Sequence, residues 1–185
     1  MDIKKLNISR RVGLIDLFKE KGFKTGVEIG TDHGGYAKDI CERYPELELF
    51  TIDPWKAYTE GTDVKSQFEV EEIYKIAKDT LEPYKNCTIV RETSMEAVKV
   101  FEPNSIDFVF IDGDHRYKYV YEDIIEWTKI VRSGGIVCGH DYKEDEGKEY
   151  GVIKAVNQYV EENNISPLYI LERGSFVPCW MFYKI

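Results

Sequence analysis

The feature that most constrains the fold is the segment 106–111, which is apolar at every position except Asp107. A strand that is apolar at consecutive positions is buried on both faces, as the central strands of a parallel sheet are. Similar short runs recur along the chain and alternate with segments of helical periodicity. This alternation is typical of a mostly parallel sheet with helices on both faces, so we expect a doubly wound α/β fold.

The pattern predicts seven strands separated by helices. The expected strands are 25–29, 47–52, 88–90, 106–111, 135–139, 168–171 and 179–183. The expected helices include 9–21 with Ser9 as N-cap, 120–131, 151–163 and an inserted segment, 57–84, whose buried face is Phe68, Val70, Ile73, Ile76, Ala77 and Leu81. The connection between the last two strands is too short for a parallel crossover, so these two strands should be antiparallel.

Composition sets limits on the class of protein. The 185 residues contain no linker or repeat, so one domain, 1–185, is expected. The net charge of −9 and the absence of a basic cluster disfavour nucleic-acid binding. No stretch approaches the ~20 apolar residues that cross a bilayer, and the N-terminus has no signal-like apolar run. With four scattered cysteines, these features favour a cytoplasmic protein with reduced thiols, and homo-oligomerisation stays open.

A glycine-containing turn follows the first expected strand. A dinucleotide fingerprint would have glycine at positions 30, 32 and 35, but Asp32 holds the middle place between Gly30 and Gly35. A carboxylate there would repel a pyrophosphate. Together with Glu28, it favours a ligand with positive charge and no phosphate, such as S-adenosylmethionine, which carries an ammonium and a sulfonium group. The alternative is a tight turn whose glycines serve geometry alone.

Asp53 ends the second expected strand, 18 residues beyond Gly35. An acidic side chain at this point can accept both hydroxyls of an adenosine ribose. As an isolated carboxylate, it would more often be a solvated turn residue. No Gly-Lys-Ser/Thr sequence follows any glycine turn, so a P-loop is absent.

Four motifs in this order resemble a known family. They are the glycine turn, Asp53-Pro54-Trp55, Ile111-Asp112-Gly113-Asp114-His115 and Gly139-His140-Asp141-Tyr142. From about 27 to 185 the chain resembles class I S-adenosylmethionine-dependent methyltransferases, and more narrowly the bacterial branch related to sugar and macrolide O-methyltransferases and to catechol O-methyltransferase. The resemblance implies a Rossmann-like seven-stranded sheet of order 3-2-1-4-5-7-6, with strand seven antiparallel.

The resemblance also implies a set of cofactor-binding residues. The methionine end would lie against the glycine turn, the ribose against Asp53, and the adenine against the segment after strand three. The implied residues are Glu28, Gly30, Thr31, Asp32, Gly34, Asp53, Pro54, Trp55, Thr93, Ser94, Met95, Asp112 and His115.

Metal-dependent members of the family bind a divalent ion through carboxylates after strands four and five. The matching residues are Asp112, His140 and Asp141, which imply Mg²⁺ or Mn²⁺. Related enzymes more often have Asp-Asp or Asp-Asn at the second position. His140 would suit a softer metal than magnesium. The alternative is that these carboxylates organise loops or bind the cofactor.

The expected reaction is transfer of a methyl group to a hydroxyl of a small-molecule acceptor. The hydroxyl must lose its proton, and a neutral imidazole with a pKa of ~6.5 can take it. His140 beside Asp141 is the expected base, His115 is the alternative, and Asp112 belongs to the same catalytic group. The rivals are a cofactor-binding protein without transferase activity and a nicotinamide-dependent oxidoreductase. A titration with both cofactors would separate them.

Aromatic side chains near these motifs could wall an acceptor pocket, although ordinary packing accounts for most such residues. The candidates are Trp55, Tyr58, Tyr117, Tyr119, Tyr142, Phe176 and Trp180.

Overall fold

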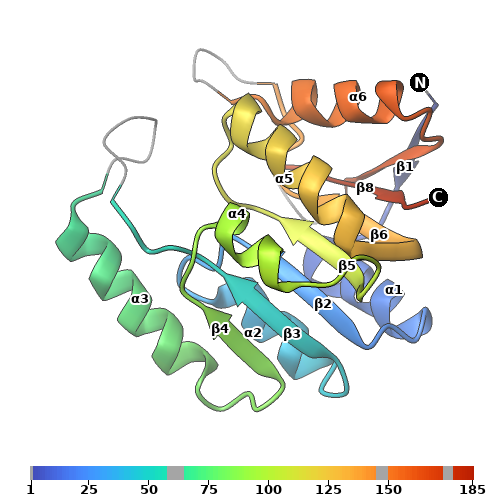
Figure 1. The fold of residues 1–185 in the computed structure, drawn as a ribbon. Helices are drawn as coiled ribbons and strands as arrows, with labels where there is room; N and C mark the ends of the chain where they lie inside the picture. Colours follow the sequence, from blue (N-terminus) through green and yellow to red (C-terminus); the bar gives the residue numbers. More distant parts are fainter. Residues whose placement is uncertain (1, 58–64, 145–149, 173–176) are drawn as a thin grey trace.

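The computed structural model describes residues 2–57, 65–144, 150–172 and 177–185. The strands in these ranges form one eight-stranded sheet of order β1-β7-β8-β6-β5-β2-β3-β4 (Figure 1). Their bounds are β1 Ile3–Leu6, β2 Thr25–Ile29, β3 Glu48–Ile52, β4 Cys87–Val90, β5 Ile106–Ile111, β6 Val131–Gly139, β7 Leu168–Leu171 and β8 Cys179–Tyr183.

The order of the seven expected strands is confirmed. Every neighbouring pair is parallel except those of β8, which runs antiparallel to both β6 and β7. The expected strand count was one too low, because β1 pairs with the edge of β7. Three of the four residues of β1 are exposed, so Ile3-Lys4-Lys5-Leu6 has no buried strand pattern to recognise. Only its pairing with β7 identifies it.

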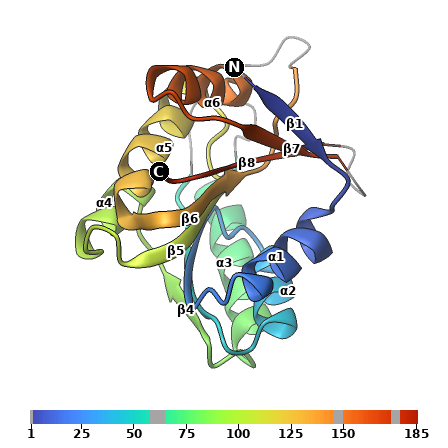
Figure 2. The ribbon, with the colours of Figure 1, turned by 90° about the vertical axis from the view of Figure 1, so that its right-hand side faces the viewer.

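Helices cover both faces of the sheet. α1 (Ile15–Glu20) and α2 (Gly35–Arg43) lie on one face, with α3 (Gln67–Leu81) beside α2. α4 (Ser94–Ala97), α5 (Tyr117–Ile130) and α6 (Val152–Glu162) lie on the other, as the edge-on view in Figure 2 shows. A π-helical turn, Arg10–Leu14, precedes α1. Its N-cap is Ser9, whose hydroxyl accepts from the backbone N–H of Val12 and Gly13, as the sequence predicted.

The core consists of two apolar layers separated by the sheet. Alternate residues of β5 enter opposite layers, with Val109 and Ile111 facing α5 and Phe108 and Phe110 facing α1 and α2. All four side chains are at most 4% exposed. This explains why residues 108–111 are all apolar, because both faces of the strand are covered.

Two helical expectations were wrong in detail. On α3, Val70, Ala77 and Leu81 are buried, but Phe68 is 74% and Ile76 48% exposed because the helix packs along one side only. Residues 58–64 of the expected insertion lie outside the described part. The helix expected at 120–131 begins at Tyr117 and ends at Ile130, since Val131 already pairs with Ile106 in the sheet. Within the described residues, no helix has the length and apolarity to cross a bilayer.

Candidate active site

A cavity of about 790 Å³ opens at the carboxyl ends of β2, β3 and β5. In an open α/β sheet, ligands bind at this edge, where the order of strands reverses. The cavity brings together twelve of the thirteen residues expected to bind the cofactor: Glu28, Gly30, Thr31, Asp32, Asp53, Pro54, Trp55, Thr93, Ser94, Met95, Asp112 and His115. The exception is Gly34. A second hollow, between α2 and the start of β4, contains none of these residues.

Gly30 allows the turn after β2 to pass directly over the end of β5. Its φ is +91°, and a Cβ there would lie 2.2 Å from the carbonyl oxygen of Asp112. Only glycine fits so close an approach of two backbones. Gly34 also has a positive φ, but a Cβ on it would meet the Leu81 side chain at 3.1 Å. Gly34 therefore permits packing against α3 and, unlike the other twelve residues, does not line the cavity.

The two carboxylates expected to supply negative charge differ in their surroundings. Glu28 is 2% exposed and accepts a hydrogen bond from Thr51, whose hydroxyl also lies 2.7 Å from that of Thr31. Burial raises the pKa of Glu28 well above its usual range, so this side chain tends to keep its proton. Asp32 is 61% exposed and pairs with His33 at 2.6 Å. The charge on this turn is therefore carried by Asp32.

Asp53 holds the loop after β3 together. Its Oδ2 accepts from the backbone N–H of Asp32 at 3.0 Å, and its Oδ1 from that of Trp55 at 2.8 Å. The Trp55 indole donates back to the carbonyl of Asp32 at 3.1 Å. Burial raises the pKa of Asp53, although these backbone donors oppose the shift. The loops after β2 and β3 thus hold the Asp53 carboxylate at the end of β3, where it lines the cavity.

The segment after β4 contributes hydroxyl groups whose partners differ. Thr93 is the N-cap of α4 and forms a capping box with Glu96, so its hydroxyl serves the helix. The Ser94 hydroxyl donates to Asp123 and accepts from the Trp127 indole at 2.8 Å. Asp123 lines the cavity as well, from α5. Ser94 therefore links the cavity to a buried carboxylate.

Asp112, directly after β5, uses its two oxygens in two directions. Oδ2 accepts from the Arg10 guanidinium at 3.0 Å. Oδ1 lies 3.6 Å from His115 Nε2 and 3.6 Å from His140 Nδ1. Arg10 in turn lies over the ring of Tyr36, 4.9 Å from its centroid. Asp112 is thereby fixed between a cation from the N-terminal segment and two imidazoles.

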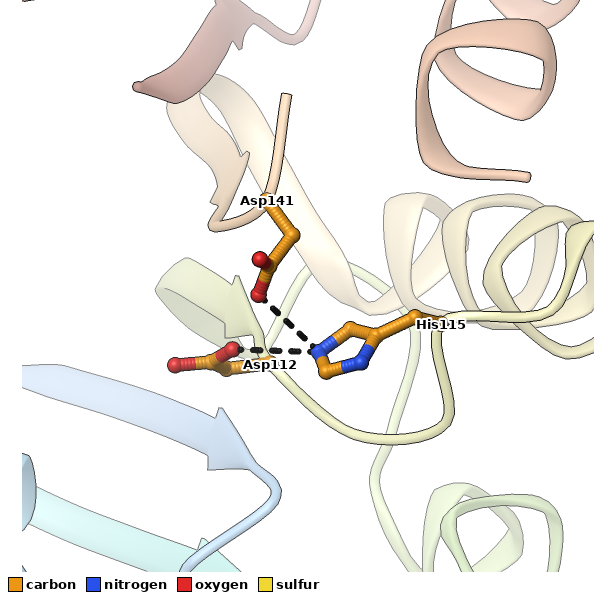
Figure 3. Close-up of side chains that lie close together, drawn as sticks. All are labelled: Asp112, His115 and Asp141. Carbon is orange, nitrogen blue, oxygen red and sulfur yellow. Dashed lines mark ion pairs between the residues drawn. The ribbon is translucent and has the colours of Figure 1, made fainter. Parts of the chain in front are cut away.

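Asp112, His115 and Asp141 converge from the ends of β5 and β6 and the loop before α5, as Figure 3 shows. His115 Nε2 lies 3.0 Å from Asp141 Oδ2, although this pair lacks the alignment of a hydrogen bond. Burial opposes a charge on His115, but the two carboxylates outweigh it and raise its pKa to about 10. Likewise, the imidazoles outweigh burial at Asp141 and lower its pKa well below the usual range. The two carboxylates thus favour the protonated form of His115.

His140 contacts Asp141 of this group, and neither His140 nor Asp141 lines the cavity. His140 Nδ1 is 3.0 Å from Asp141 Oδ2, while its Nε2 is buried with no hydrogen-bond partner among the described residues. His115 faces the cavity and stacks on Tyr150, with ring centroids 5.0 Å apart. The geometry therefore favours His115 over His140 as the imidazole that a bound molecule would meet.

The cavity residues that were not predicted from the sequence include Arg10, Asp123 and Tyr150. Asp123 had a signal, since it interrupts the apolar stripe Val120, Ile124 and Trp127 of α5. Arg10 had none, because its contact with Asp112 spans 102 residues.

The aromatic candidates divide between lining and packing. Trp55 and Tyr119 line the cavity, whereas Tyr117, Tyr142 and Trp180 belong to the core layer beneath α5 and α6. Tyr58 and Phe176 lie outside the described residues.

Comparison with known proteins places the fold in a family. Residues 27–142 match the family model described as "Methyltransferase domain". An uncharacterized protein of Acanthamoeba polyphaga mimivirus is 29% identical over 143 residues, which are 77% of this chain but 62% of that protein. This chain thus spans less than two thirds of that relative.

Solved structures share the fold at low identity. An O-methyltransferase from Bacillus cereus, in complex with SAH, matches with a TM-score of 0.68 at 15% identity, covering 96% of this chain and 82% of that one. Spermidine synthase from Thermotoga maritima matches with a TM-score of 0.62 at 16% identity, covering 92% and 57%. With more than half of its length matched by the family model, the chain belongs to the methyltransferase domain family and has the class I S-adenosylmethionine-dependent methyltransferase fold.

Proposed function

We propose that this chain is a single methyltransferase domain that transfers the methyl group of S-adenosylmethionine to a hydroxyl of a small-molecule acceptor. The observation that carries the proposal is the convergence of the Gly30 turn, Asp53 and the Asp112–His115 pair on one cavity of about 790 Å³. A cavity of this size suits a cofactor together with part of a small acceptor. The family match and the neighbour in complex with SAH support the same cofactor.

The cofactor would lie across the strand ends. Its ribose hydroxyls would donate to Asp53, whose oxygens are already oriented by two backbone N–H groups. Its methionine end would pass over Gly30, where the absence of a side chain leaves room. Asp32, the exposed carboxylate of this turn, would attract the positively charged end of the molecule. This arrangement points the sulfonium toward Asp112 and His115.

A divalent ion fits the group formed by Asp112, His115 and Asp141. One donor atom from each lies within 4.8 Å of the others, and His115 Nε2 is buried without an aligned hydrogen-bond partner among the described residues. Two carboxylates and one imidazole suit Mn²⁺ better than Mg²⁺, which prefers oxygen ligands alone. When bound, such an ion would lower the pKa of an acceptor hydroxyl and so ease removal of its proton.

This assignment changes the expected roles of the two histidines. His115 would be a metal ligand facing the acceptor, held in orientation by its stack on Tyr150. His140 would position Asp141 through the 3.0 Å contact of its Nδ1, because its other nitrogen is buried away from the cavity. A ligand cannot also be the base, and His140 does not line the cavity, so the proton of the acceptor hydroxyl would pass to bulk water. The rest of the rate enhancement would come from alignment of the hydroxyl with the methyl group.

The cofactor is tested by isothermal titration with S-adenosylhomocysteine and, separately, NADH. We expect micromolar binding of the former, about −8 kcal/mol, and at least ~10-fold weaker binding to Asp53→Ala, which loses the ribose acceptor. Tight NADH binding without a response to S-adenosylhomocysteine would favour an oxidoreductase. If S-adenosylhomocysteine binds but no member of a panel of hydroxylated metabolites is methylated, the result would support a cofactor-binding protein without transferase activity.

The metal assignment is tested by Mn²⁺ titration of chelator-treated protein. His115→Ala should weaken Mn²⁺ binding by more than ~100-fold, whereas His140→Ala, the matched control, should cost about 10-fold because it only orients a ligand. Cofactor binding should survive in both. A larger loss in His140→Ala would return His140 to the ligand set, and full methyl transfer in excess EDTA would remove the metal from the reaction.

A further inference from the structure

The main chain of His115 is held by the start of α6, a part of the chain that follows the last metal-site carboxylate. The backbone N–H of Gly151 donates to the His115 carbonyl at 2.8 Å. Gly151 is the N-cap of α6, and its own carbonyl accepts from the backbone N–H of Ala155 at 2.9 Å. This hydrogen bond therefore joins the first turn of α6 to the residue whose imidazole lines the cavity.

The approach of α6 to this loop is so close that only glycine fits at position 151. A Cβ there would lie 2.3 Å from the nitrogen, the Cα and the Cβ of Tyr117, which is the first residue of α5. Backbone atoms at this distance cannot move aside as the end of a flexible side chain can. The φ of Gly151 is −124°, so its backbone conformation does not itself require glycine. Glycine is required because the two helices meet at this point.

The neighbouring residue, Tyr150, holds the imidazole itself. The rings of Tyr150 and His115 are stacked, with centroids 5.0 Å apart and planes inclined by 7°. Lys143 Nζ lies 4.9 Å from the centroid of the Tyr150 ring and 3.6 Å from Asp141 Oδ1. Two consecutive residues thus fix His115, one through its ring and the other through its carbonyl group.

We propose that Tyr150 and Gly151 form a clamp that positions His115 for metal binding. The inference rests on the proposed metal site. His115 Nε2 lies 3.0 Å from Asp141 Oδ2 and 3.6 Å from Asp112 Oδ1, so a small shift of its loop would separate the three donor atoms. Groups that orient a ligand typically contribute ~10- to 100-fold to metal affinity. Both residues of the clamp would act through His115 and are positioning residues.

The test is Mn²⁺ titration of the chelator-treated full chain, with S-adenosylhomocysteine titrated separately. Gly151→Ala should weaken Mn²⁺ binding ~10-fold or more, because the added Cβ pushes the His115 loop away from the carboxylates. Gly135→Ala is the matched control. Its Cβ would lie 2.4 Å from the Asp107 carbonyl oxygen, an equally crowded position near the amino end of β5. This variant should lose stability but bind Mn²⁺ as wild type does. Both variants should keep their affinity for S-adenosylhomocysteine within about 3-fold of wild type.

A second variant tests the clamp without crowding the backbone. Tyr150→Leu removes the ring that stacks on His115 and should weaken Mn²⁺ binding at least ~3-fold. It carries the test if circular dichroism shows that Gly151→Ala does not fold.

Wild-type Mn²⁺ affinity in folded Gly151→Ala or in Tyr150→Leu would overturn the clamp. An equal loss of Mn²⁺ binding in Gly135→Ala, or a parallel loss of S-adenosylhomocysteine binding in Gly151→Ala, would also overturn it, because either result indicates a general loss of structure. If wild type bound no Mn²⁺, the metal site itself would be wrong. The clamp fails alone only when wild type binds Mn²⁺ and the variants behave in one of these ways.

Discussion

Gly30→Ala should strongly destabilise the protein, because the added Cβ would overlap backbone. It would lie 2.2 Å from the Asp112 carbonyl oxygen and 2.8 Å from the Gly113 nitrogen. A φ of +91° adds strain of about 1–3 kcal/mol for a residue other than glycine. The shift would also disturb two bonds of 2.8 Å, from Gly30 to Ile52 and from Asp112 to Ile29, each worth about 1 kcal/mol. We expect a loss of about 3–4 kcal/mol.

Thermal and urea unfolding measure this loss, which for a chain of this size is a fall in Tm of roughly 10 °C. Two glycines serve as controls. Gly22→Ala has a φ of +67° with no atom within 4 Å of the added Cβ, so it isolates the strain and should cost about 1 kcal/mol. Gly35→Ala meets neither obstacle and should be within about 0.5 kcal/mol of wild type. If Gly30→Ala were no worse than Gly22→Ala, the close approach of the two loops would be refuted.

Three further results are expected. The pKa of Asp123 is about 7 in the folded protein against 3.8 when unfolded, so the protonated side chain favours the folded state below about pH 4. This contribution to stability is lost as the pH rises through 7. Urea unfolding should therefore show Asp123→Asn gaining on wild type between about pH 4 and 8, by at most about 4 kcal/mol; parallel pH profiles would contradict this. Arg10→Ala should lower the Tm, because it breaks the ion pair with Asp112, whose two side chains are 18% and 21% exposed. Arg43→Ala, which breaks the ion pair with Asp16 at 43% exposure on each side, should change the Tm little. Equal effects would show that the Arg10–Asp112 pair does not stabilise the fold more than an exposed pair does. In metal-free protein, NMR should show His115 still protonated at about pH 9, and Asp141→Asn should bring its pKa down toward 6.5; a wild-type midpoint near 6.5 would exclude the ion pair.

The sequence by itself determined the class of fold and seven of the eight strands of the sheet. Hydrophobic periodicity reflects burial, and the segment 106–111 is apolar at every position except Asp107 because core layers cover both faces of β5. The motif at Gly30 was readable for a related reason, since a glycine between a strand and a helix marks a conformation that other residues resist. Asp53 was found because it directly follows an expected strand, whereas Asp112 was indicated by a motif that resembles the methyltransferase family.

Contacts between distant segments required the tertiary structure. β1 is a strand only because β7 offers an unpaired edge, and its own residues are mostly exposed. Arg10 reaches Asp112 across 102 residues, a distance in sequence that no local pattern encodes. In the sequence each of the two histidines stands beside an aspartate, and His140 was the expected base with His115 as the alternative. They differ in the structure because His115 enters from the loop before α5 and lines the cavity, whereas His140 follows β6, does not line the cavity and has its Nε2 buried. Burial and side-chain orientation, which depend on how other elements pack, therefore distinguish the two histidines.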